Sequence, residues 1–100
     1  MQTVILHNML EIRCVVSGSV QGVGYRDYVS VSAGQCCVTG WIYNKPDGSV
    51  EVCAQGKPNN LKDFIEYLHE GSVMSRVEDV AVEWIEPQDL YDDFSIWRSM

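Results

Sequence analysis

Apolar residues or cysteine occupy every second position from Leu10 to Val16, and the positions between them are mostly charged or polar. This period of two is typical of a strand that buries one face. Two further apolar segments, 41–43 and 49–54, are separated by residues 44–48, which contain the sequence Pro-Asp-Gly. Pro-Asp-Gly favours a tight turn, because it supplies a preset φ, an Asx hydrogen bond and a positive φ. The pattern predicts a strand near residues 10–17 and a hairpin over residues 41–54.

A helical spacing of i, i+3, i+4 and i+7 is occupied by Leu61, Phe64, Ile65 and Leu68. This spacing predicts an amphipathic helix that begins near Pro58 and ends before Gly71. Alternation at residues 80–84 predicts another strand, and residues 94–97 predict a short last one.

Residues 25–37 fit two patterns. Tyr25, Val29 and Ala33 form a helical stripe, whereas residues 28–32 alternate and are rich in serine and β-branched residues, which favours a strand. We predict a helix, because the order then becomes β-α-β-β-α-β, a compact two-layer α+β arrangement.

The sequence has 100 residues, 46% hydrophobic and 21% charged, which fits one domain. We assign that domain to residues 10–98 and expect residues 1–9 to be a disordered arm or an upstream start, with Met9 as the native initiator. The net charge is −7, and the excess acid lies entirely after residue 50. No basic stripe is present to bind a phosphate backbone, so we expect no nucleic-acid partner.

Neither a membrane span nor a secretion signal is predicted. No run approaches the roughly 18 to 20 apolar residues that span a bilayer, and the stretch 3–6 is too short for a signal peptide. We therefore expect a cytoplasmic protein with no membrane partner. The cysteines form no C-x-x-C motif and both histidines lie far from any cysteine cluster, which argues against a zinc site. We expect free thiols, with Cys14 and Cys53 on opposite faces of the sheet, and no metal or other cofactor.

The candidate site is the segment G-x-x-x-G-x-G at 18–24, followed by Tyr25-Arg26. It matches neither a dinucleotide fingerprint nor a Walker motif. Glycines before a helix allow backbone N–H groups to converge on an anion, although an ordinary strand-to-helix turn has the same composition. A cation in the first helical turn opposes the macrodipole by roughly 0.3–1 kcal/mol. Arg26 therefore indicates a bound phosphate, unless it pairs with Asp27 or a distant carboxylate.

Several ordered motifs resemble the acylphosphatase family over almost the whole chain, from about Leu10 to Arg98. They are Gly18-Ser19-Val20-Gln21-Gly22-Val23-Gly24-Tyr25-Arg26, Gly40-Trp41-Ile42-Tyr43-Asn44, Asp47-Gly48-Ser49-Val50-Glu51, Ala54-Gln55-Gly56 and Asp93-Phe94-Ser95-Ile96. The resemblance implies a ferredoxin-like sandwich, with an antiparallel sheet and both helices on one face. It also implies metal-independent hydrolysis of a small-molecule acyl phosphate to a carboxylate and phosphate. We expect the protein to be a monomer.

The same resemblance assigns the site residues. Arg26 would bind the phosphate and Asn44 would orient the attacking water. The phosphate-binding loop would comprise Val20, Gln21, Gly22, Val23, Gly24, Tyr25 and Arg26. An acyl phosphate has a weakly basic carboxylate leaving group, so a site without His, Cys or carboxylate suits this chemistry.

Three positions depart from the family pattern. Ser19 replaces a basic residue, Cys37 replaces a glycine that ends the first helix, and Arg98 lies one position past the usual terminal basic residue, behind Trp97. Two other functional classes stay open: a catalytically silent anion-binding or regulatory module, and a nucleic-acid or protein-binding ferredoxin-like domain. The second would need exposed aromatic and basic residues on the sheet, where the strands carry Glu11, Glu51 and Glu83.

Overall fold

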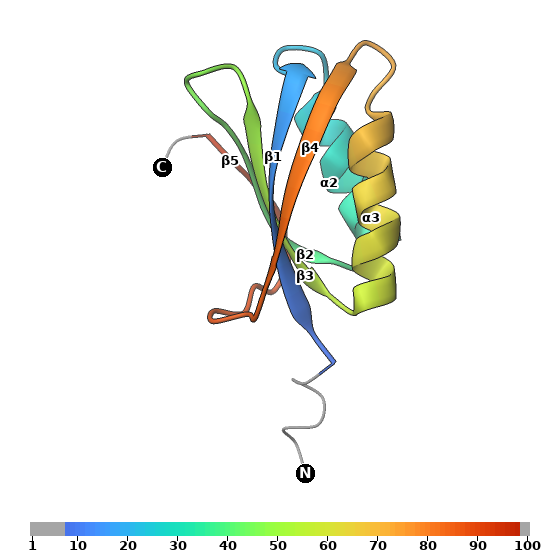
Figure 1. The fold of residues 1–100 in the computed structure, drawn as a ribbon, viewed down its shortest axis with the longest axis vertical. Helices are drawn as coiled ribbons and strands as arrows, with labels where there is room; N and C mark the ends of the chain where they lie inside the picture. The colour runs from blue at the N-terminus through green and yellow to red at the C-terminus, as the bar shows by residue number, and fades with distance from the viewer. Residues whose placement is uncertain (1–7, 99–100) are drawn as a thin grey trace.

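Five strands and two helices make up the computed structural model, which describes residues 8–98 (Figure 1). In chain order they are β1 (Leu10–Ser19), α2 (Tyr25–Gln35), β2 (Thr39–Asn44), β3 (Val50–Gly56), α3 (Pro58–Glu70), β4 (Arg76–Ile85) and β5 (Phe94–Trp97). The predicted helix over the ambiguous segment is therefore confirmed through Gln35. The expectation for residues 1–9 falls mostly on residues outside the described range.

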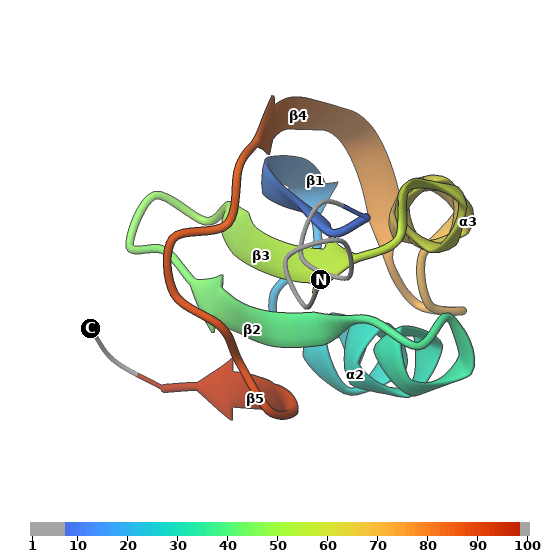
Figure 2. The same ribbon diagram turned by 90° about the horizontal axis from the view of Figure 1, so that it is seen from below.

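The sheet has the strand order β4-β1-β3-β2-β5, and both helices cover the same face (Figure 2). The first four strands pair antiparallel, which confirms the ferredoxin-like two-layer fold. β5 pairs parallel with β2, so the complete sheet is mixed rather than wholly antiparallel. The reason is topological: β4 ends at the end of the sheet where β2 begins, so the chain enters β5 in the same direction as β2.

The main core lies between the sheet and the helices. The in-phase residues of β1, Ile12, Cys14 and Val16, have no exposed surface and pack with the buried residues of α3, among them Phe64. Pro58 occupies the first turn of α3 and Gly71 is its C-cap, as predicted. Burying this amphipathic face is what holds α3 on the sheet.

The opposite face of the sheet is also partly buried, which corrects the expectation of one buried face. Glu11 is only 3% exposed and Cys53 is fully buried. The cause is the connection 86–93, which crosses this face between β4 and β5 (Figure 2). The side chain of Gln55 binds this connection, because its Nε2 donates to the Asp89 carbonyl and its Oε1 accepts from the Tyr91 amide.

Cys14 and Cys53 lie on opposite faces, as predicted, since Cys14 pairs with Val52 in the β1–β3 register whereas Cys53 pairs with Arg13. All four cysteines are free thiols. Within residues 8–98, none of the helices has the length and hydropathy needed to cross a bilayer.

Candidate active site

The connection from β1 to α2 is a glycine-containing loop fixed at both ends. Val20 and Tyr25, each 1% exposed, anchor residues 20–25 in the core. Gly22 and Gly24 have φ angles of 72° and 76°, the left-handed region that a Cβ disfavours. Gly24 is also the N-cap of α2, and no side chain caps that helix end. The first amides of α2 are thus left available to an anion.

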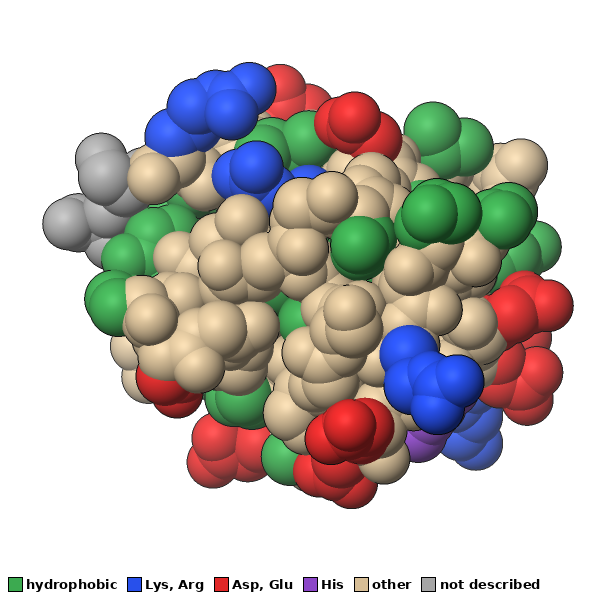
Figure 3. Space-filling view, turned by 90° about the horizontal axis from the view of Figure 1, so that it is seen from above, with side chains coloured by type: hydrophobic (Ala, Val, Ile, Leu, Met, Phe, Trp, Pro, Cys, Tyr) green, Lys and Arg blue, Asp and Glu red, His purple; other side chains and the backbone are tan. Residues whose placement is uncertain are grey.

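A cavity of about 230 Å³ lies at this loop. It is lined by Val20, Gly22, Gly24, Tyr25, Arg26, Asp27, Ile96 and Arg98. Five of the predicted site residues are therefore brought together by the fold. Figure 3 views the molecule from the end that carries this loop: backbone and uncharged polar atoms dominate the centre, and most acidic side chains lie at the periphery.

Arg26 is half-buried at the cavity and has no carboxylate within ion-pairing distance among residues 8–98. The ion pair in this part of the chain joins Arg13 to Glu11, on the far face of the sheet. The alternative pairing of Arg26 with Asp27 is therefore absent from the described residues, although Asp27 lines the same cavity. The guanidinium is left with donors for a ligand.

Asn44 is the last residue of β2 and does not itself line the cavity. It shares a face of the strand with Ile42, because side chains alternate along a strand. Ile42 pairs with Ile96 of β5, which lines the cavity, so Asn44 lies one step further along the same face. Its Oδ1 is buried and has no hydrogen-bond partner among residues 8–98, which makes it the orphaned buried side-chain acceptor of this region.

Gln21 and Val23, two predicted loop residues, do not line the cavity and contact the structures on either side of it. Gln21 Nε2 donates to the carbonyls of Lys45 and Ser49, each at 2.8 Å, in the β2–β3 turn. On the other side, Ser72 Oγ donates to the Val23 carbonyl at 3.0 Å. The loop is thus held between the hairpin and the α3–β4 connection, as the arrangement at the top of Figure 1 shows.

Arg98 is a cavity residue that the sequence did not assign to the site. It follows β5 directly, and β5 lies beside β2, so the sheet order brings a second guanidinium to the cavity. The available signal was its position after the last predicted strand, but the sequence does not give the order of strands in the sheet.

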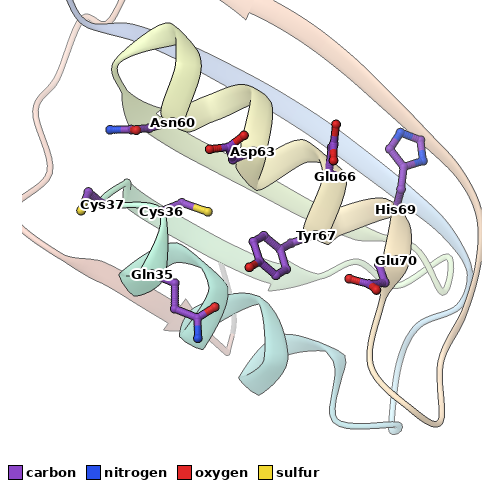
Figure 4. Close-up of a pocket in the computed structure, with 9 residues that line it drawn as sticks. All are labelled: Gln35, Cys36, Cys37, Asn60, Asp63, Glu66, Tyr67, His69 and Glu70. Atoms are coloured by element: carbon purple, nitrogen blue, oxygen red, sulfur yellow. The ribbon is translucent and has the colours of Figure 1, made fainter.

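A larger groove, of about 910 Å³, lies between the end of α2 and the length of α3. Figure 4 shows the Tyr67 ring and the Cys36 thiol between the two helices, whereas Glu66 and His69 point away from α2. The groove includes Asp63, Glu66 and Glu70 and no Lys or Arg, so its charge is unsuited to an anion. None of the predicted site residues lines it. Within residues 8–98, no three His, Cys, Asp or Glu side chains are arranged to hold a metal ion.

The family model described as acylphosphatase matches residues 12–96. The chain belongs to the acylphosphatase family. The expected enzyme class, an acylphosphatase hydrolase, is confirmed by this match and by relatives of that name.

Relatives in the acylphosphatase family cover nearly the whole fold. The chain is 42% identical to the acylphosphatase of Bacillus licheniformis over 88 residues, which are 88% of this chain and 98% of the relative. The crystal structure of acylphosphatase from Bacillus subtilis matches with a TM-score of 0.86 at 39% identity, covering 88% of this chain and 98% of that one. An acylphosphatase structure from Coxiella burnetii matches with a TM-score of 0.85 at 36% identity, covering 91% of this chain and 95% of that one.

Proposed function

We propose that this protein hydrolyses acyl phosphates to a carboxylate and inorganic phosphate, at a metal-independent site built from one chain. The observation that carries the proposal is the orphaned Asn44 Oδ1 on the side of the sheet that faces an anion-sized cavity. Leaving a buried acceptor unpaired costs roughly 1–3 kcal/mol. A water molecule that donates to Oδ1 removes this cost and gains a fixed position beside the phosphate.

The phosphoryl group is assigned to the cavity at the N-terminus of α2. Amides of residues 20–26 and the Arg26 guanidinium supply donors for its oxygens, and the helix N-terminus adds a positive partial charge. Arg98 adds a second guanidinium. Two local cations are useful here, because the protein as a whole carries a charge of −7 and would otherwise repel an anionic substrate.

In the proposed reaction, the oxygen of the water held by Asn44 attacks phosphorus. The bond between phosphorus and the acyl oxygen breaks, and its electron pair leaves with the carboxylate. The proton lost by the water passes to a phosphate oxygen, so no protein base is required. The amides and Arg26 stabilise the charge on the equatorial oxygens of the transferred group, and Asn44 contributes by fixing the line of attack.

A hydrolysis assay with a simple aromatic acyl phosphate in the presence of a chelator tests this function. We expect equal release of carboxylate and phosphate, an unchanged rate with chelator, and competitive inhibition by inorganic phosphate. In ¹⁸O-labelled water the label should enter phosphate and not the carboxylate, because attack is assigned to phosphorus. Release no faster than in buffer alone would contradict the proposal and favour the anion-binding module.

A further inference from the structure

The side chain of Gln21 connects the two halves of the proposed site. It lies in the loop between Val20 and Gly22, both of which line the phosphate cavity. Its Nε2 carries two hydrogens, and each is donated to a carbonyl of the β2–β3 turn, Lys45 and Ser49, at 2.8 Å. Because carbonyl oxygens only accept, this contact requires the amide nitrogen and fixes the orientation of the side chain.

The two carbonyls are those that close the turn. Ser49 O also accepts from Lys45 N at 2.9 Å, and Lys45 O accepts from Gly48 N at 3.2 Å. Asp47 Oδ1 accepts from both the amide and the hydroxyl of Ser49, at 2.9 and 2.6 Å. The turn is therefore internally ordered, and a contact at its two ends moves or holds it as a unit.

The contacts lie directly beside Asn44, at the turn end of its strand pair. Lys45 directly follows Asn44, and Ser49 directly precedes Val50, which is the register partner of Asn44 in β3. No other hydrogen bond involving a side chain joins the loop 20–24 to the turn 45–49 in the described part of the chain. Gln21 is therefore the side chain that ties the phosphate-binding loop to the turn beside Asn44.

We propose that Gln21 is a positioning residue, which sets Asn44 at the correct distance from the phosphate loop through its two hydrogen bonds to the turn. The inference rests on the proposed function. A displacement of about 1 Å between reacting groups can cost about 10²-fold in rate. Loss of the contact should therefore affect turnover more than phosphate binding, which the loop amides and Arg26 supply without Asn44.

The test compares Gln21→Met, which keeps the size of the side chain but donates no hydrogen bond, with the control Gln35→Met on the exposed end of α2. We expect Gln21→Met to lower kcat by about tenfold or more and to change the inhibition constant of inorganic phosphate by less than about threefold. Gln35→Met should leave both unchanged. In the Asn44→Ala background, Gln21→Met should have little further effect on kcat, because Gln21 acts through Asn44. An undiminished effect in that background, or wild-type kcat in Gln21→Met, would overturn the proposal.

Gln21→Glu gives a second test that does not depend on the stability of the Met variant. A carboxylate facing two carbonyls repels them, whereas a protonated carboxyl donates one hydrogen bond. The kcat of Gln21→Glu, relative to wild type, should therefore rise as the pH falls toward about 4–5. A pH-independent ratio would count against the proposal.

A readout without catalysis separates this proposal from the proposed function. In wild type, inorganic phosphate should slow amide hydrogen exchange both in the loop 20–24 and in the turn 45–49. In Gln21→Met it should protect the loop but not the turn. If wild type fails to hydrolyse acyl phosphate, the proposed function falls, and this pattern still supports the link made by Gln21. Equal protection of the turn in both proteins would refute the link.

Discussion

The indole ring of Trp97 stacks on that of Trp41, with ring centroids 4.5 Å apart and planes inclined by 13°. Trp41 is 3% exposed, and the Arg13 guanidinium lies over its ring, 5.4 Å from the ring centroid. Trp97 is the last residue of β5 and immediately precedes Arg98. The stack therefore fixes the chain at the point from which Arg98 reaches the phosphate cavity.

Replacing Arg98 should weaken phosphate binding more than turnover. We expect Arg98→Gln to raise the inhibition constant of inorganic phosphate by about five- to tenfold, or ~1–1.4 kcal/mol, as for a partly screened charge-assisted contact. The loss should shrink at high salt, because Arg98 is solvent-exposed. Lys62→Gln, which removes one charge from an exposed position on α3, is the control. Equal inhibition constants for wild type and Arg98→Gln would exclude Arg98 as a second cation that binds phosphate.

Replacing Arg26 should damage both binding and turnover, because its guanidinium is assigned to the phosphate in the ground and transition states. Arg26→Ala should lose both phosphate affinity and turnover. Arg26→Lys keeps the charge but lacks the planar pair of donors, so its kcat/KM should also fall steeply. Steady-state kinetics with phosphate inhibition measure the two effects. A fully active Arg26→Lys would mean that charge alone is required.

The local elements of the fold could be predicted from the sequence because their signals are local. Pro58 and Gly71 delimit α3, and the Pro-Asp-Gly turn delimits the hairpin, at the positions that the structure shows. Burial of Glu11 could not be predicted in this way. It depends on the connection 86–93, which has no periodicity, and on the contacts that connection makes with Gln55.

In the candidate site, too, residues with a local sequence signal could be predicted, whereas those placed by distant contacts could not. Arg26 was identifiable because a cation at a helix N-terminus is locally unfavourable without an anion. Arg98 was not, since its place at the cavity follows from the pairing of β5 with β2. For Gln21, the sequence predicts only a place in the phosphate-binding loop. The hydrogen bonds of its side chain could not be predicted, because their acceptors in the turn lie 24 and 28 residues later in the chain.

Replacing Cys37 by glycine should stabilise the fold. It is the non-glycine residue with positive φ, 58°, among residues 8–98. The amide of Val38 binds the Ala33 carbonyl and that of Cys37 binds the Gly34 carbonyl, as in a Schellman helix end. We expect Cys37→Gly to raise the free energy of unfolding by ~1 kcal/mol. Cys37→Ala, which removes the thiol but keeps the Cβ, should give no such gain in urea unfolding; equal gains would refute the backbone explanation.

Buried thiols should make the fold sensitive to alkaline pH. Burial raises the pKa of the Cys14 thiol from an ordinary value of 9.0 to about 12, and that of Cys53 likewise to about 12. The unfolded chain ionises these groups at lower pH than the folded one does, so ionisation favours unfolding. The free energy of unfolding should therefore be constant below about pH 9, as far as these thiols contribute, and fall from there toward pH 12.

Urea unfolding at several pH values between about 8 and 11 measures this dependence. Cys14→Ala should be less stable at the lowest pH but show a shallower fall, because one of the buried thiols with a raised pKa is gone. Val16→Ala removes buried volume from the same strand but no ionisable group, so it should lower the free energy of unfolding and leave the slope with pH unchanged. Parallel curves for wild type and Cys14→Ala would contradict the prediction.

The central claim is that Asn44 positions the attacking water while the loop and Arg26 hold the phosphate. It is tested most directly by measuring kcat and phosphate affinity together in Asn44→Ala, after circular dichroism has shown that the variant is folded. We predict that kcat falls by two to three decades or more, ~2.7–4 kcal/mol, while phosphate binds with nearly wild-type affinity. Loss of phosphate binding with an intact kcat at saturation would contradict the division of roles. Wild-type kcat with unchanged affinity would contradict the role of Asn44 altogether.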